Sequence, residues 1–108
     1  STDGFMEADA GNRIAAVRFS FVNTGTIAYD DAPCNGAKLV DKKGQQYDCD
    51  ITFSKIAAGP MLPAAVKLSP GNKALGFLAF QVPANVKIAQ VQFSQDSGFG
   101  ETAQWDVR

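Results

Sequence analysis

The chain has 108 residues, 45% of them hydrophobic, with ten basic and eleven acidic side chains and a formal net charge of −1. This length and apolar content are typical of one folded domain and exclude a disordered chain. The balanced charge, with basic residues scattered along the sequence, argues against binding to nucleic acid or to an anionic membrane. No apolar run approaches the roughly 18 residues that a membrane-spanning helix needs.

The N-terminal part predicts a loosely ordered segment over residues 1–12 and a long strand over residues 14–22. Apolar and polar side chains alternate in this strand with the two-residue period of a strand that has one solvated face. The alternating set is Val17, Phe19 and Phe21 against Arg18 and Ser20. Asn23 and Gly25 should end the strand, because both residue types tolerate left-handed backbone angles. A short second strand is expected over residues 27–30.

Residues 37–40 and 45–48 are predicted to pair as a hairpin, with residues 41–44 as its turn. Cys34 and Cys49 lie at the outer ends of the two arms, and we expect them to form a disulfide, helped by a bulge near residues 35–36. A disulfide favours an exported protein. The alternative is a reduced, buried pair in a cytosolic domain. A metal site would need two further soft ligands that the sequence does not supply.

The pattern is weakest over residues 51–68, where we expect an irregular segment with one short helical turn. Pro70 and Gly71 then suit a type II turn, because proline presets φ and glycine supplies a positive φ. Residues 75–82 are apolar on both faces, as in a strand buried within a sandwich. Pro83 should end that strand, because it has no N–H to donate to a sheet.

Two further strands are predicted, over residues 86–93 and at the C-terminus. Val91 and Phe93 should face the core, and in the last strand Ala103, Trp105 and Val107 alternate with Gln104 and Asp106. We expect Trp105 to be a core residue that holds down the end of the chain. About seven short strands without helical periodicity predict an all-β, immunoglobulin-like antiparallel sandwich, one domain over residues 1–108.

Carboxylates are the only candidate catalytic groups that the sequence offers. The chain has no histidine, which removes the common nucleophile–histidine pairs and histidine-ligated zinc, and no cofactor-binding motif is present. Carboxylates near the cysteines suggest either a weak Ca²⁺ site or solvated loop charges. These residues are Asp30, Asp31, Asp48 and Asp50. A carboxylate-based hydrolase is a still weaker alternative, since it needs two carboxylates across a cleft.

Two apolar loop features suggest binding. Pro60, Met61 and Leu62 lie in a segment stiffened by two prolines, and if exposed they would be ordered before docking. Such a segment, over residues 58–63, could serve a secreted protease inhibitor; the alternative is that Met61 and Leu62 fill the core. Phe99, between two glycines, is a second candidate binding residue, or else a cap on the core.

Four motifs in this order resemble a family: Asn-Thr-Gly over residues 23–25, the hairpin over 39–47, Leu-Ser-Pro-Gly over 68–71, and the strand over 76–83. The chain is similar, over residues 14–107, to immunoglobulin-like domains of unknown function in secreted proteins and lipoproteins of Gram-positive bacteria. A secreted mycobacterial immunogenic β-sandwich antigen is a distant relative of that group.

The resemblance implies an exported β-sandwich, often tethered to the cell envelope. The family has no known catalytic residues that could be assigned to positions of this sequence. Its motif residues are structural: Asn23, Gly25, Gly44 and Gly71 in turns and Pro83 at a strand end. The cysteine pair is a departure from the family pattern. We therefore expect a non-enzymatic module, secreted or on the extracellular face of the envelope, with a structural role or a protein partner. The expectation leaves open whether an export signal or lipid anchor preceded Ser1.

Overall fold

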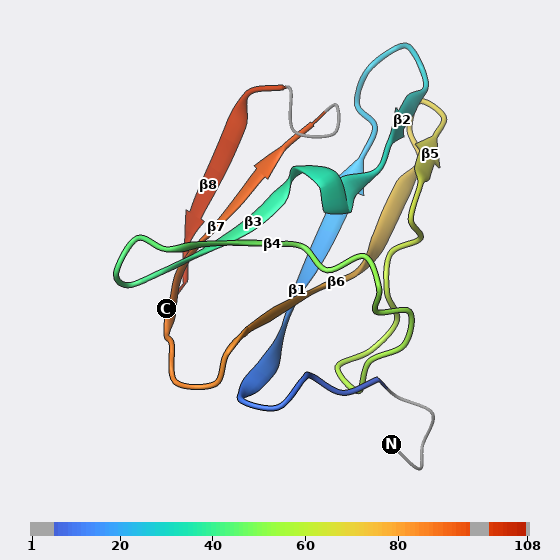
Figure 1. Ribbon diagram of the computed structural model, residues 1–108. Helices are drawn as coiled ribbons and strands as arrows, with labels where there is room; N and C mark the ends of the chain where they lie inside the picture. The colour runs from blue at the N-terminus through green and yellow to red at the C-terminus, as the bar shows by residue number, and fades with distance from the viewer. Residues whose placement is uncertain (1–5, 96–99, 108) are drawn as a thin grey trace.

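The computed structural model describes residues 6–95 and 100–107, whose regular secondary structure is almost entirely β-strand (Figure 1). The strands are β1 (Asn12–Val22), β2 (Tyr29–Asp31), β3 (Ala37–Asp41), β4 (Gln46–Asp48), β5 (Val66–Leu68), β6 (Lys73–Pro83), β7 (Ile88–Ser94) and β8 (Thr102–Asp106), and a 3-10 helix η1 (Pro33–Gly36) precedes β3. The all-β prediction is confirmed, with eight strands in place of about seven. No helix within the described residues is long and apolar enough to cross a membrane.

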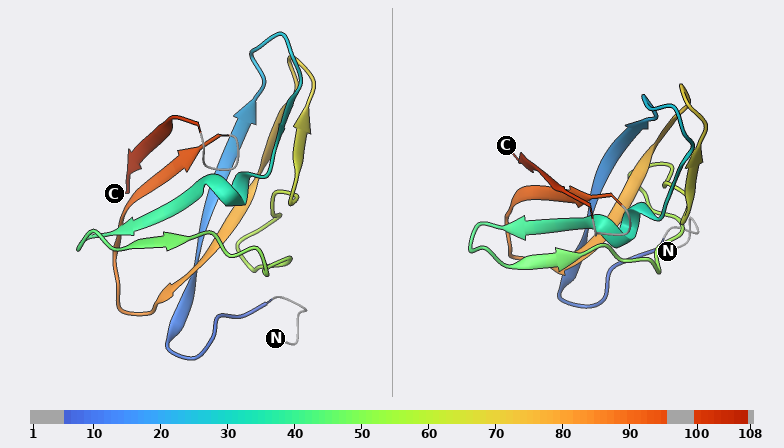
Figure 2. Two further views of the ribbon diagram at one scale, coloured as in Figure 1. Left: turned by 45° about the horizontal axis from the view of Figure 1, so that its top comes forward. Right: turned by 90° about the horizontal axis from the view of Figure 1, so that it is seen from above.

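All the strand pairs are antiparallel and form three sheets. β1 and β6 pair along their whole length, from Asn12 opposite Pro83 to Val22 opposite Lys73. A four-stranded sheet has the order β4-β3-β7-β8, and β2 pairs with β5. The β1–β6 ribbon crosses one face of the four-stranded sheet, which gives the predicted two layers (Figures 1 and 2).

The main core lies between these two layers. It contains buried side chains from β1, β3, β6 and β7: Phe19, Ala37, Leu39, Leu78, Phe80, Val82, Val91 and Phe93. The other face of β6 is covered as well, because Ala79 and Phe77 pack against Phe53 and Ile56 from the segment after β4. This second small core explains why β6 is apolar on both faces.

The predicted turn at the end of β1 forms, but through a different mechanism. Gly71 adopts the expected positive φ of 86°, and Gly44 in the β3–β4 turn also has a positive φ, of 87°, whereas Gly25 does not. Asn23 instead acts through its side chain. Its Nδ2 donates to the carbonyl oxygens of Ile27 at 2.9 Å and Leu68 at 2.8 Å, and its Oδ1 accepts from the Gly25 N–H at 3.0 Å. The amide thereby joins β1 to the end of β5.

The segment before β1 is held in place from Met6 onward, where a loosely ordered segment was expected. The Met6 N–H donates to the Lys55 carbonyl at 2.8 Å, and the Asp9 N–H donates to Gln81 Oε1 at 2.6 Å. These bonds connect residues 6–11 to the segment after β4 and to β6.

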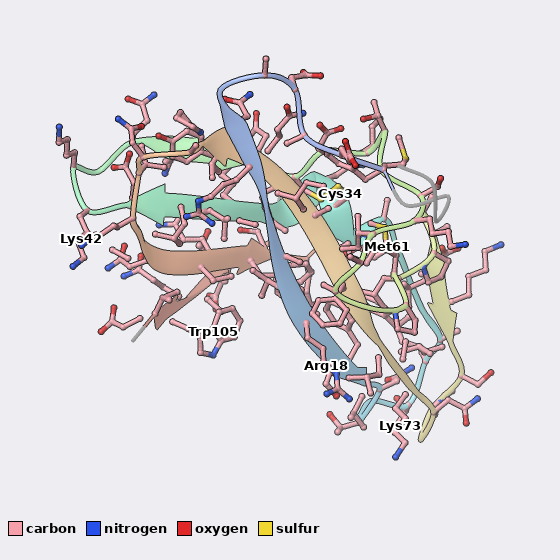
Figure 3. All side chains as sticks on the ribbon, turned by 90° about the horizontal axis from the view of Figure 1, so that it is seen from below. Arg18, Cys34, Lys42, Met61, Lys73 and Trp105 are labelled. Carbon is pink, nitrogen blue, oxygen red and sulfur yellow. A yellow bond between two sulfur atoms is a disulfide. The ribbon has the colours of Figure 1, made fainter. Side chains whose placement is uncertain are left out.

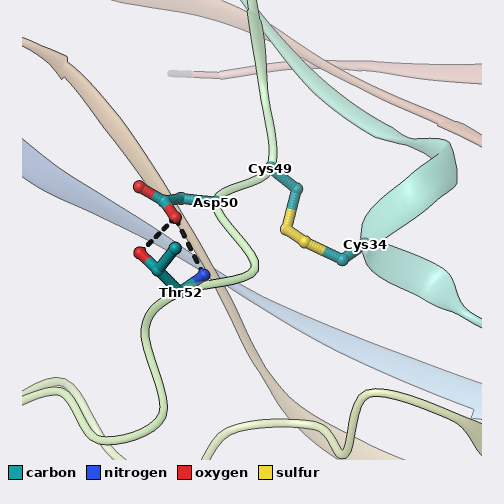
Figure 4. The surroundings of a disulfide bond; sticks show 4 residues. All are labelled: Cys34, Cys49, Asp50 and Thr52. Carbon is teal, nitrogen blue, oxygen red and sulfur yellow. Dashed lines mark hydrogen bonds between the residues drawn. A yellow bond between two sulfur atoms is a disulfide. The ribbon is translucent and has the colours of Figure 1, made fainter.

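The predicted disulfide between Cys34 and Cys49 is confirmed (Figure 4). Helix η1, which the sequence analysis did not predict, positions Cys34 in place of the expected bulge, and the two Cα atoms lie 5.3 Å apart. Cys49 directly follows β4 and forms an isolated bridge with Phe80 of β6. The disulfide therefore fixes the chain where it passes from the four-stranded sheet to the β1–β6 ribbon.

Removing the disulfide should destabilise the domain. The double variant Cys34→Ala/Cys49→Ala should lose about 3 kcal/mol of unfolding free energy, because the bridge closes a loop with a sequence separation of 15 residues. Urea denaturation of the variant and of the wild type measures the loss. The wild type treated with a reductant is the control and should lose a similar amount. A loss well below about 1 kcal/mol would contradict a stabilising role for the bridge.

Candidate functional site

An open groove with a volume of about 890 Å³ lies between β1 and β8. Its lining comes from β1, β7 and the chain around β8: Val17, Arg18, Phe19, Ser20, Phe21, Val91, Phe93, Gln95, Gly100, Glu101, Thr102, Ala103 and Trp105. Figure 3 shows Trp105 beside β1, on the side away from β6. The groove is therefore a gap between two strands that belong to different sheets.

The groove exists because both strands that border it lie at the edge of a sheet. Within residues 6–95 and 100–107, β1 pairs with β6 alone and β8 pairs with β7 alone. All five residues of β8 are exposed. Edge strands present unpaired N–H and C=O groups that can bind another extended chain.

The hydrogen-bond alternation of antiparallel strands identifies the unpaired groups. The Asn23 N–H donates to the Asn72 carbonyl at 2.9 Å in continuation of the β1–β6 register. The N–H and C=O groups of odd-numbered β1 residues therefore point toward β6. Those of Ala16, Arg18 and Ser20 point toward the groove. On β8 the bond from Val107 N–H to the Ala89 carbonyl, at 2.7 Å, fixes the same alternation. The groups that face away from β7 are those of Thr102, Gln104 and Asp106.

Trp105 is not the core residue that the sequence predicts, since 52% of its surface is exposed. The alternation itself was predicted correctly. Trp105 lies opposite Val91 in the β7–β8 register, and directly opposed residues project from the same face of a sheet. Val91 is buried on the core side. Trp105 therefore points toward the core side but stays exposed, because the second layer has only the two strands β1 and β6.

Aromatic rings form the floor of the groove. The ring centroids of Phe19 and Phe21 are 5.9 Å apart, and those of Phe21 and Phe93 are 5.2 Å apart. Arg18 and Glu101 add one charge of each sign to the lining. The site thus combines an apolar floor, backbone groups without a partner among the described residues, and one charge of each sign.

The proline-bounded segment lies along the opposite edge of the ribbon. The Phe77 N–H donates to the Pro60 carbonyl at 2.9 Å, and the Leu62 N–H donates to the Phe77 carbonyl at 3.0 Å. Leu62 is a core residue with 7% exposure, Met61 is half-buried, and Pro60 is exposed. Gly76 leaves the room for this approach, since a Cβ there would lie 2.7 Å from the Leu62 nitrogen. Of the three predicted binding residues in this segment, Pro60 and part of Met61 are accessible, and Leu62 is not.

Phe99, the other predicted binding residue, lies outside the described residues. The groove itself was not predicted. Its one signal in the sequence is Trp105, near the C-terminus. The predicted number of strands does not show how many of them would cover this side chain.

The carboxylates near the disulfide form separate local interactions. Asp48 forms a salt bridge with Lys38 at 2.7 Å. Asp50 accepts bonds from the Thr52 hydroxyl at 2.6 Å and the Thr52 N–H at 2.9 Å, which lower its pKa (Figure 4). Asp31 accepts from the Tyr29 hydroxyl at 2.8 Å. Within residues 6–95 and 100–107, no three carboxylates or cysteines gather where they could hold a metal ion, so the structure does not bring Asp30, Asp31, Asp48 and Asp50 together as a calcium site.

Asp41 is a buried carboxylate that organises the β3–β4 turn. Its Oδ1 accepts from the N–H groups of Lys43 at 2.8 Å and Gln45 at 2.9 Å, and its Oδ2 accepts from the Tyr47 hydroxyl at 2.8 Å. Burial by itself would raise the pKa of Asp41. The bonds from Tyr47, Gln45 and Lys43 together outweigh burial and lower that pKa below its ordinary value of 3.8. The same contact with Asp41 raises the pKa of Tyr47 above 10.0.

The lowered pKa of Asp41 predicts acid sensitivity. Its contribution to stability is present above pH 3.8 and is lost as the pH falls through the lower pKa of the folded state, because there the unfolded chain binds the proton more readily. Urea denaturation between pH 7 and pH 2 should show stability falling below about pH 4. Asp41→Asn should be less stable at pH 7 and lose less stability across the acid range. The control Asp30→Asn, at an exposed position, should leave the pH 7 stability nearly unchanged. Equal acid slopes for Asp41→Asn and the wild type would contradict the prediction.

The exposure of Trp105 also predicts a contrast between two truncations. Trp105→Ala should cost about 1 kcal/mol or less of unfolding free energy, as is usual for surface positions. Leu62→Ala should cost about 2–5 kcal/mol, because it leaves a cavity in the core. Thermal and urea denaturation measure both values. A cost of about 3 kcal/mol or more for Trp105→Ala would mean that its ring is buried in solution.

No curated protein and no solved structure matches the chain. A family model described as a domain of unknown function, DUF4352, matches residues 1–104, nearly the whole sequence. The chain therefore belongs to the DUF4352 family of domains of unknown function.

Proposed function

We propose that this domain is a non-enzymatic protein-binding module and that the groove between β1 and β8 is its binding site. The exposure of Trp105 carries the proposal. A tryptophan that projects from the core-facing side of a sheet is normally covered, and here 52% of it is exposed beside two unpaired strand edges. Tryptophan is among the residues that most often anchor protein interfaces.

We place the module outside the cell, as a secreted domain or on the extracellular face of the envelope. The disulfide between Cys34 and Cys49 supports this location, because such bonds persist in oxidising compartments. The resemblance of the motifs to domains of Gram-positive secreted proteins and lipoproteins supports it as well.

A non-enzymatic role fits the chemistry of the chain. It has no histidine, and the two carboxylates with a shifted pKa, Asp41 and Asp50, have it lowered by structural hydrogen bonds. A carboxyl group that acts as a general acid near neutral pH needs a raised pKa. The inhibitor alternative needs an exposed Leu62, and that side chain lies in the core. The groove is therefore the feature that supports a function best.

A capture experiment tests the proposal. Purified domain is immobilised and exposed to culture supernatant and envelope proteins of the cells that produce it. We expect the wild type and the control Ile51→Ala, which alters an exposed residue outside the groove, to retain the same protein. Trp105→Ala should retain at least about tenfold less of it, since truncating an interface anchor costs about 2 kcal/mol or more. Equal retention by Trp105→Ala, or no retained protein, would contradict a binding role for the groove.

A further inference from the structure

We propose that the groove binds an extended segment of a partner protein as an added β-strand, which pairs with the free edge of β1 and covers Trp105. This inference rests on the proposed binding function and specifies the chemistry of the partner. It follows from three features of the groove: its backbone groups, its uncovered apolar face and the charge of Arg18.

The backbone of β1 supplies the pairing groups. Ala16, Arg18 and Ser20 direct their N–H and C=O groups away from β6, as the register shows. An extended chain presents matching groups with the same two-residue repeat. The opposite edge of the ribbon is already occupied, because Phe77 of β6 bonds to Pro60 and Leu62, and the Asp50 N–H donates to the Ala79 carbonyl. Among the described residues, no strand pairs with the other side of the ribbon, and that side borders the groove.

An added strand on β1 would complete the layer that faces β8. Alternate side chains of a strand point to opposite faces of the sheet. Those on the core side would lie over Trp105 and beside Phe21 and Phe93, which line the groove. They should be apolar, because the surface that they cover is mainly aromatic. In this placement the added strand would bury Trp105. Burial is what the sequence predicts for Trp105, because it alternates with the polar residues Gln104 and Asp106.

The outer face of the added strand requires a different chemistry. Arg18 is exposed on the face of β1 opposite to Phe19. In the described parts of the chain Arg18 has no ion pair or hydrogen-bonded side-chain partner. Opposite charges at directly opposed positions stabilise a strand pair. The segment should therefore alternate apolar and polar residues, with an acidic residue opposite Arg18.

A second copy of the domain fits this edge less well than a partner segment. In the antiparallel register in which two β1 strands overlap most, Arg18 of each copy would lie opposite Ala16 of the other, so the two Arg18 side chains would be diagonal neighbours on the same face. Like charges in such positions destabilise the pairing. We therefore assign the edge to a segment of another protein.

The probe for this proposal is a nine-residue peptide that alternates threonine and valine and has aspartate in place of the central threonine. Trp105 is the only tryptophan in the chain, so its fluorescence reports directly on the groove. Titration with the peptide should give a saturable blue shift of the emission and protection from acrylamide quenching. A matched peptide with central lysine should bind about fivefold more weakly, the ratio expected for reversing one cross-strand charge pair.

Two comparisons make the test specific. Arg18→Glu should reverse the preference, so that the lysine peptide binds more tightly than the aspartate peptide. Lys73→Glu, the same charge change at an exposed position of β6 outside the groove, should leave the preference unchanged. A peptide with the same side chains but N-methylated on the residues that pair with β1 should not bind, because it cannot donate to the strand edge.

Three results would overturn the proposal. The first is the absence of any blue shift with either peptide at millimolar concentration. The second is equal binding of the N-methylated peptide. The third is a blue shift that depends on protein concentration without peptide and coincides with dimer formation in sedimentation, which would assign the groove to a second copy. If the capture experiment succeeds while the peptides fail, the binding function stands and strand addition does not; if both fail, both proposals fail.

Discussion

The long antiparallel pairing of β1 with β6 is the interaction on which the rest of the structure depends. Its eleven residue pairs form a ribbon with an apolar inner face and a partly apolar outer face. The inner face closes the main core against the four-stranded sheet, and the outer face holds the segment after β4 through a second small core. Because the ribbon is only two strands wide, it covers β3 and β7 but leaves β8 uncovered. The core and the groove are thus two results of the same pairing.

Local sequence patterns predicted those parts of the fold that local physics determines. The alternation of Phe19 and Phe21 with Arg18, the positive φ of Gly71, and the two apolar faces of β6 are properties of neighbouring residues. The disulfide was predictable because its cysteines flank one hairpin. In each of these cases the determining contacts lie within one strand, one turn or one pair of strands.

The features that were missed depend on contacts between distant segments. Asn23 acts through a bond to Leu68, 45 residues away, so its turn composition suggested the wrong mechanism. Leu62 is buried because Gly76 lets the backbone approach β6, and no local pattern reveals that approach. Trp105 was assigned to the correct face, but its burial depends on how many strands the opposite layer contains. Periodicity determines the direction of a side chain and does not determine what lies above it.

The asymmetry of the β1–β6 ribbon limits how far association at this ribbon can proceed. The segment around Pro60 and Leu62 seals one long side against further pairing, so strands cannot accumulate on both sides in the manner of a growing fibril. A strand that paired with β1 would itself become the new edge strand of that sheet. If a partner strand binds there as proposed, one bound strand per domain is expected at the ribbon, unless that strand carries a free edge of its own. The domain can therefore expose aromatic side chains beside β1 without exposing both edges of the ribbon to strand-by-strand polymerisation.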